Sequence, residues 1–193
     1  VSSGELRRSP VEGVTANGLR TTQAEYEFDV LVYATGFDAM TGTIKRLNIR
    51  GRNDQLLADK WKDGPRMYMG LQSVGFPNFF TVTGPGSPSV VSNVLHSIEQ
   101  HVEWIDACIA HLRKNHIRTI EPQQAAEDAW VEHVNKAAEG SMMTAPTCNS
   151  WYLGTNIEGK PRGFMPYLDG TKTDHKDCED TLAKVYRGFD RSI

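Results

Sequence analysis

Two glycine-rich segments have residue types that bind nucleotides or phosphate in other proteins. The first, Gly84-Pro85-Gly86-Ser87-Pro88-Ser89, matches the dinucleotide fingerprint G-x-G-x-x-G except at its last position. In the fingerprint the third glycine permits close packing of helix on strand, and here Ser89 replaces it. In addition, no acidic residue ends a second strand about twenty residues further on. A complete dinucleotide site is therefore not indicated. The pattern does predict a glycine turn into a helix N-terminus, where free N–H groups and the helix dipole favour an electron-rich ligand.

The second segment, residues 154–161, has the spacing of a P-loop up to its last position. A P-loop needs Ser or Thr there to hold magnesium, and Pro161 has no hydroxyl group. The residues that follow do not predict a helix, so the amides that would bind phosphate are also missing. The sequence therefore does not favour a nucleoside triphosphatase.

Other catalytic patterns are incomplete. Ser87 lies at a strand-turn-helix junction, but Pro85 and Ser89 replace the glycines of a nucleophile elbow. The histidines form no H-E-x-x-H or H-x-x-x-H pair, so we expect no metal site and interpret all six as solvated helix residues: His96, His101, His111, His116, His133 and His175. We likewise interpret four acidic residues as one solvated helix face: Glu127, Asp128, Glu132 and Glu139.

Hydrophobic patterning predicts the strands that must position these segments. Residues 11–15 and 19–22 predict a hairpin around Asn17-Gly18. Residues 29–33 and 79–83 are apolar on both faces, which is typical of central, parallel strands. A doubly wound sheet needs more strands than these two. Because the chain also begins with Val1 and not with Met, we expect a fragment whose other strands lie upstream.

Helical periodicity is strongest after the first glycine-rich segment. Ser87 as N-cap, Pro88 at the first helical position and Asn115 as the stop predict a long helix. Its apolar residues form one stripe: Val91, Leu95, Ile98, Val102, Ile105, Ile109 and Leu112. Further helices are predicted at about 122–139 and 177–186.

Residues 140–170 have little periodicity, although structureless loops beyond about 12–15 residues are uncommon unless functional or disordered. The segment is rich in large apolar residues: Met142, Met143, Trp151, Tyr152, Phe164, Met165 and Tyr167. We interpret it as a lid or pocket wall. The alternative is a loop that simply packs over the core.

Composition narrows the class of protein. The 193 residues are about one and a third times the length expected per domain. A net charge of -3 offers no basic field for nucleic acid, and no apolar run reaches the length of a membrane span. Three cysteines, Cys108, Cys148 and Cys178, fit neither a disulfide framework nor a zinc ribbon, so we expect a reduced, cytoplasmic protein.

Three motifs together resemble the C-terminal part of a type I Baeyer–Villiger monooxygenase, most closely the phenylacetone and steroid monooxygenase branch. They are Ala34-Thr35-Gly36-Phe37-Asp38, the Gly84–Ser89 segment and Ser150-Trp-Tyr-Leu-Gly-Thr-Asn-Ile-Glu-Gly-Lys-Pro-Arg162. The resemblance implies an α/β fold: the C-terminal half of an FAD-binding, Rossmann-like (doubly wound) domain, followed by helices and a long ordered or mobile loop. Residues 1–38 would end the NADP-binding segment and form the hinge strand, and 39–193 would belong to the FAD-binding and substrate domain.

The resemblance also implies cofactors and site residues. The family uses FAD, NADPH and O2 to insert one oxygen atom beside a ketone carbonyl through a C4a-peroxyflavin, which gives an ester or lactone. The implied hinge residues are Thr35, Gly36, Phe37 and Asp38. The residues implied to lie against the flavin are Gly84, Pro85, Gly86, Ser87, Asn93 and Val94, with backbone N–H groups near its N1–C2=O edge. Trp151 would donate its indole N–H to the nicotinamide cofactor. The implied ketone pocket comprises Pro88, Ser89, Val90, Val91, Val94 and Met165.

The family's FAD glycine motif, active-site Asp and peroxyanion-stabilising Arg would all precede Val1, so no residue of this chain receives a certain catalytic role. We therefore expect the isolated chain to be inactive and to bind FAD poorly. Two alternatives stay open. One is a flavin monooxygenase that oxidises nitrogen or sulfur, and the other is a stand-alone module whose aromatic- and Met-rich loop binds a partner.

Overall fold

The computed structural model describes residues 6, 8–34, 36–88, 92–146 and 150–193. The chain divides into two compact units, Val1–Phe37 and Asp38–Ile193. This division lies beside the boundary expected at residue 38, and the cofactor assigned to each side stays a prediction. No helix in the described part of the chain is long and apolar enough to cross a bilayer.

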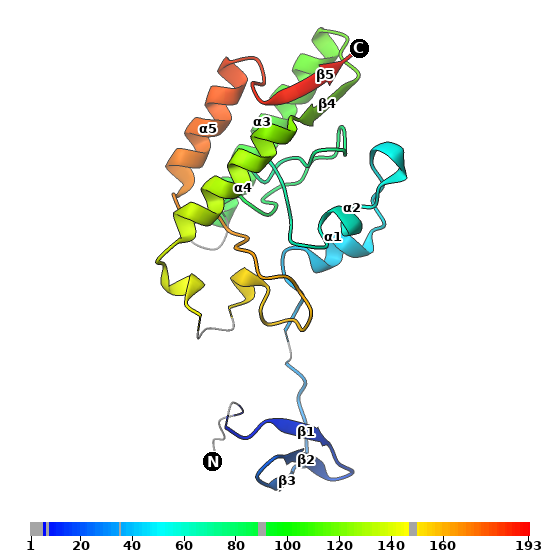
Figure 1. Cartoon of the computed structure of the whole chain (residues 1–193), viewed down its shortest axis with the longest axis vertical. Coiled ribbons are helices and arrows are strands. Elements are labelled where there is room, and N and C mark those ends of the chain that lie inside the picture. Colours follow the sequence, from blue (N-terminus) through cyan, green and yellow to red (C-terminus); the bar gives the residue numbers. More distant parts are fainter. Residues whose placement is uncertain (1–5, 7, 35, 89–91, 147–149) are drawn as a thin grey trace. The chain divides into compact units, whose positions relative to one another are not determined.

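The first unit is a three-stranded antiparallel sheet in the order β1-β2-β3 (Figure 1). Its strands are β1 (Val11–Val14), β2 (Gly18–Thr21) and β3 (Glu25–Glu27). The predicted hairpin is confirmed by the pairing of β1 with β2. Gly18 is required by β3, because a Cβ there would lie 1.9 Å from the Tyr26 carbonyl oxygen.

The buried strand predicted at residues 29–33 is not present within the described residues. The side chains of Val30, Val32 and Tyr33 are 75%, 78% and 70% exposed. A central strand needs hydrogen-bonding neighbours on both edges. Among the described residues no strand pairs with this one.

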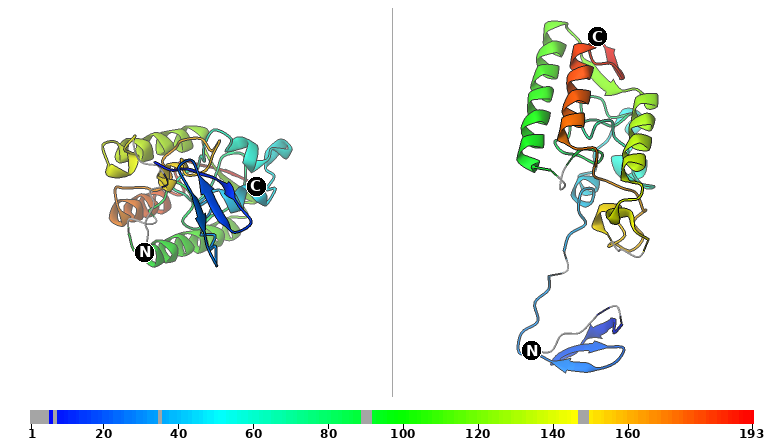
Figure 2. Two further views of the ribbon diagram at one scale, coloured as in Figure 1. Left: turned by 90° about the horizontal axis from the view of Figure 1, so that it is seen from below. Right: turned by 90° about the vertical axis from the view of Figure 1, so that its left-hand side faces the viewer.

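The second unit consists mainly of helices. Its long helices are α3 (Val94–Lys114), α4 (Gln124–Ala138) and α5 (Thr171–Ala183), and α3 lies beside α5 (Figure 2). The short ones are α1 (Gly42–Arg46), α2 (Leu57–Lys60), η1 (Arg52–Asp54), η2 (Met142–Thr144) and η3 (Trp151–Leu153). An antiparallel pair, β4 (Thr119–Pro122) with β5 (Phe189–Ser192), joins distant parts of the sequence.

Several element boundaries differ from prediction. Helix α4 confirms the helix expected at 122–139, and α5 begins earlier than residue 177. Helix α3 ends before Asn115 as predicted but begins at Val94, because the Asn93 side chain caps it by accepting a hydrogen bond from the Leu95 N–H at 3.2 Å. Residues 79–83 form no strand, and both described sheets are antiparallel. The parallel sheet half is therefore not present within the described residues.

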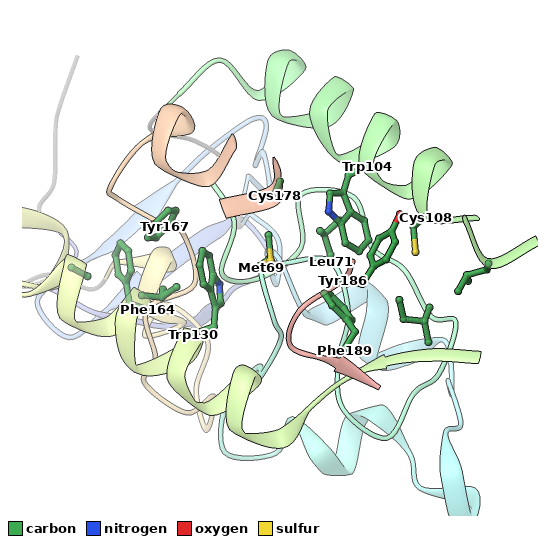
Figure 3. Packing of buried hydrophobic residues seen from close by; sticks show 14 of the residues in the cluster. Met69, Leu71, Trp104, Cys108, Trp130, Phe164, Tyr167, Cys178, Tyr186 and Phe189 are labelled. Atoms are coloured by element: carbon green, nitrogen blue, oxygen red, sulfur yellow. The ribbon is translucent and has the colours of Figure 1, made fainter. Parts of the chain in front are cut away.

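The core lies between α3, α4, α5 and the segment around Met69 and Leu71 (Figure 3). The side of α3 that is buried is not centred on its apolar stripe: Leu95, Val102 and Ile109 are 73%, 50% and 36% exposed. Its buried residues include Trp104 and three polar ones, Ser97, Gln100 and His101. Polar contacts with α5 explain this rotation, such as the hydrogen bond from the Trp104 indole to Thr181 Oγ1 at 3.0 Å.

The described parts of the segment 140–170 pack largely over the core. Leu153, Phe164, Met165 and Tyr167 are buried, whereas Met142 is exposed. For these residues the structure agrees with the alternative interpretation, a loop that packs over the core. The movement of a lid stays a prediction.

Candidate functional site

The Gly84–Ser87 turn is fixed by the structure around it. Gly84 has no space for a side chain, since a Cβ would lie 2.6 Å from the Gly70 carbonyl oxygen. Ser87 Oγ donates to the Gly84 carbonyl at 2.7 Å, which closes the turn. Gly86 has a φ of +88°, and its carbonyl accepts a hydrogen bond from the Trp130 indole of α4 at 2.9 Å. Shape and hydrogen bonds therefore hold one conformation of this turn.

The N–H groups of the turn are already used inside the chain. The Gly84 N–H donates to the Gly70 carbonyl at 3.1 Å, the Gly86 N–H to Met165 at 2.6 Å, and the Ser87 N–H to Gly84 at 3.2 Å. The prolines of the turn have no N–H. The expectation of free N–H donors at residues 84–88 is therefore wrong, because the helix begins later and the N–H groups of the turn donate to Gly70, Met165 and Gly84.

The other residues implied for flavin and ketone differ in accessibility. Asn93 and Val94 are exposed at the start of α3, although the Asn93 side chain is engaged as the cap. Pro88 and Met165 are buried by this chain itself. Three pocket residues, Ser89, Val90 and Val91, lie outside the described residues. The role of the set in a ketone pocket stays a prediction.

The hinge motif and the Trp151 motif meet at one ion pair. Lys160 Nζ lies 2.5 Å from Asp38 Oδ1 and donates to the Ala39 carbonyl at 3.1 Å. The Lys160 side chain is largely buried and passes over Gly154, which has a φ of +73°. Lys160, which lies in the segment with partial P-loop spacing, thus joins two segments of the second unit. In the hinge motif, Thr35 lies outside the described residues, Gly36 has a φ of +81° and Phe37 is exposed.

Trp151 begins the single turn η3. Its ring lies on that of Tyr152, with centroids 4.1 Å apart and planes tilted by 33°. The side chain is half-buried, and no hydrogen bond joins its indole N–H to another described residue. The role of this donor toward a nicotinamide cofactor stays a prediction.

A cavity of about 380 Å³ opens beside the turn. Its lining includes Pro85, Gly86, Trp130, Phe164, Lys60, Arg66 and Arg162. Lys60 and Arg66 are already paired, with Glu127 and Asp128 respectively. Hydrogen bonds from Gln124 and Arg66 hold the pKa of Asp128 below its usual range.

Two buried polar residues were missed by the sequence reasoning. Glu127 is fully buried and accepts hydrogen bonds from Lys60 Nζ, Ser73 Oγ and the Val74 N–H. His101 is also fully buried. The solvated interpretation is wrong for both, and no local pattern separates them from the exposed acids and histidines near them. Their partners are distant in sequence, so only the fold reveals them.

No protein-family model matches the chain. Its relatives include 2-oxo-Δ3-4,5,5-trimethylcyclopentenylacetyl-CoA monooxygenase of Pseudomonas putida, 38% identical over 96% of this chain and 34% of that protein. A Baeyer–Villiger monooxygenase of Pseudooceanicola batsensis is 37% identical over 88% of the chain and 31% of its own length. Phenazine N-monooxygenase PhzNO1 of Lysobacter antibioticus is 35% identical over 98% of the chain and 34% of its length.

Solved structures agree with these relatives. A closed crystal structure of cyclohexanone monooxygenase matches 98% of this chain and 35% of its own, with a TM-score of 0.90 and 37% identity. Steroid monooxygenase bound to NADP matches the same shares, with a TM-score of 0.83 and 44% identity. OTEMO in complex with FAD and NADP matches 98% of this chain and 34% of its own, with a TM-score of 0.89 and 36% identity.

The described fold is therefore that of a portion of monooxygenases solved with NADP, or with FAD and NADP. Within that class, the chain is homologous to the Baeyer–Villiger monooxygenases. It spans about a third of the length of the curated relatives that it matches.

Proposed function

We propose that this chain is the C-terminal third of an FAD- and NADPH-dependent Baeyer–Villiger monooxygenase. The whole enzyme would insert one oxygen atom of O2 beside a ketone carbonyl and form an ester or lactone. The observation that carries the proposal is homology over nearly the whole chain to enzymes three times its length, one of them named for cyclohexanone and one solved with FAD and NADP. The free thiols of Cys108 and Cys178 suit a reduced, cytoplasmic setting.

The exposed apolar segment 29–33 supports a larger parent protein. Three of its side chains are at least 70% exposed, and burying apolar area stabilises a fold by about 25 cal/mol per Å². We infer that this segment and residues 79–83 pair with strands from the rest of the enzyme and complete a Rossmann-like sheet. Residues 1–38 would then belong to the NADP-binding side and 39–193 to the FAD and substrate side.

The accessible residues fit a flavin and a nicotinamide only in part. The half-buried Trp151 would offer its indole N–H to the nicotinamide cofactor, and the exposed Asn93 and Val94 would bring the start of α3 against the flavin. The Gly84–Ser87 turn would contribute a fixed surface and not N–H donors, because its N–H groups are engaged. Bound FAD would supply oxygen activation, with electrons from NADPH.

This chain's own residues would organise that chemistry. The Trp151 loop would exclude water from the site, and the Lys160–Asp38 ion pair would tie the loop to the hinge segment. Pro88, Ser89, Val90, Val91, Val94 and Met165 would form one wall of the ketone pocket.

An enzyme that oxidises nitrogen is the second candidate. It is favoured by the relative named phenazine N-monooxygenase, which matches 98% of the chain at 35% identity. Because the two reactions share a scaffold, overall similarity does not distinguish them. Their products do distinguish them, since one reaction gives an ester or lactone and the other an N-oxide.

The test uses the full-length enzyme with NADPH and, in turn, cyclohexanone, a thioether and an aromatic N-heterocycle. We expect NADPH consumption matched by lactone, identified by its mass. N-oxide as the only product would replace the proposal by the second candidate. A second test titrates FAD into the isolated 193-residue chain. A complex of micromolar affinity or tighter would contradict the view that the missing part supplies most of the FAD site.

A further inference from the structure

The residue before the glycine turn has a strained backbone. Thr83 has a φ of +50°, in the left-handed region that β-branched residues rarely adopt. Such a conformation persists only where its surroundings hold it, and it often marks a functional site. The Thr83 N–H donates to Nδ1 of His101 in α3 at 3.1 Å. The His101 side chain therefore fixes the backbone of the residue that precedes the Gly84–Ser87 turn.

The chemistry of His101 determines where its proton lies. A ring nitrogen that accepts a hydrogen bond carries no proton, so the neutral ring has its proton on Nε2. Nε2 lies 3.8 Å from Asp174 Oδ2, and both side chains are fully buried. Asp174 Oδ2 accepts a hydrogen bond from Gln100 Nε2 at 3.2 Å. Within the described residues, His101 Nε2 and Asp174 Oδ1 have no hydrogen-bond partner. A proton on Nε2 faces the negative Asp174 carboxylate, so that carboxylate favours the tautomer that leaves Nδ1 free to accept.

A metal ion is the competing explanation for this cluster. Ligand atoms of His101, Asp174 and Cys178 lie within 4.8 Å of one another. A metal on Nε2 would move the ring proton to Nδ1, where it would face the Thr83 N–H. The geometry therefore favours a hydrogen-bonded support over a metal centre.

We propose that His101 is a positioning residue: by accepting the Thr83 N–H, it holds the left-handed conformation that directs the Gly84–Ser87 turn, while the nearby Asp174 carboxylate favours the ring proton on Nε2. This inference rests on the proposed function, which places the turn against the flavin. His101 itself touches neither reacting atoms nor cofactor.

The test uses four single variants of the full-length flavoenzyme and two double variants, in which Thr83→Gly is combined with His101→Leu and with Cys108→Ala. His101→Leu removes the acceptor, whereas His101→Asn supplies an amide oxygen close to the position of Nδ1. Thr83→Gly removes the strain, because glycine adopts positive φ readily. Cys108→Ala is the matched control, a buried position on the same helix with no bond to the turn. For each we measure FAD dissociation, peroxide released per NADPH and the melting temperature.

His101→Leu leaves a buried N–H unpaired, so we expect about tenfold weaker FAD retention and more peroxide. His101→Asn should keep most of the parent behaviour, and Thr83→Gly should restore most of it in the His101→Leu background. If Cys108→Ala lowers the melting temperature or FAD retention, adding Thr83→Gly should not restore either quantity. Failure of Thr83→Gly to rescue His101→Leu would overturn the proposal, as would stoichiometric zinc in the purified enzyme. Thr83→Gly could rescue the melting temperature of His101→Leu while no variant changes FAD retention or peroxide release. That result would support His101 as the positioning residue and would reject contact of the turn with the flavin.

Discussion

Replacing Lys60 by methionine is expected to destabilise the second unit strongly, because it leaves the buried Glu127 carboxylate without its main partner. Lys60 Nζ lies 2.8 Å and 3.1 Å from the two carboxylate oxygens, and the Glu127 side chain is 0% exposed. Removing one partner of a buried ion pair costs about 3–5 kcal/mol. Ser73 Oγ and the Val74 N–H still donate to Glu127 at 3.2 Å and 2.8 Å, so we expect the lower end, about 3 kcal/mol.

Thermal unfolding of the full-length enzyme measures this loss. For a unit of this size, about 2–4 °C per kcal/mol converts the loss to a fall of about 6–12 °C in melting temperature. Lys62→Met is the matched control, since Lys62 is exposed and such substitutions change stability by about 0.5 kcal/mol or less. Because the two partners act together, Lys60→Met with Glu127→Gln should cost less than the sum of the single variants. A Lys60→Met enzyme as stable as the Lys62→Met control would refute the reasoning.

Three further predictions concern function, pH and reactivity. Trp151→Ala in the full-length enzyme should raise the NADPH concentration required and increase peroxide release, whereas Tyr152→Phe should change neither; equal peroxide yields would remove Trp151 from that role. Burial and a nearby carboxylate raise the pKa of Asp177 above its unfolded value, so its ionisation opposes folding as pH rises through the folded pKa. Asp177→Asn should therefore raise the melting temperature at pH 7, and the gain should vanish below about pH 4, where the unfolded carboxyl is protonated; a gain independent of pH would contradict this cause. Burial raises the pKa of Cys108 to about 11 and also raises that of Cys178, so both thiols should resist a disulfide reagent at pH 8 until urea is added, and rapid labelling of the native enzyme would show that they are accessible.

Local patterns in the sequence determined the elements whose partners are near in the chain. The β1–β2 hairpin around Asn17-Gly18, helix α4 and the end of α3 at Asn115 all follow from turn chemistry, periodicity and a capping residue. The motifs around Gly36, Gly84 and Trp151 carry the resemblance to Baeyer–Villiger monooxygenases. The signals for these elements act over a few residues. Such signals can still fail, since the local cap predicted at Ser87 is replaced by Asn93.

Only the tertiary structure decided which groups are buried and which donors are free. The apolar run at residues 29–33 is exposed because a strand needs neighbours that no described residue supplies. His101 and Glu127 have the same local pattern as solvated residues, yet they lie in the interior, where they accept hydrogen bonds from groups far away in sequence. The N–H groups of the glycine turn are likewise taken by Gly70 and Met165. Burial and hydrogen-bond satisfaction depend on contacts across the whole fold, and periodicity along the chain does not encode them.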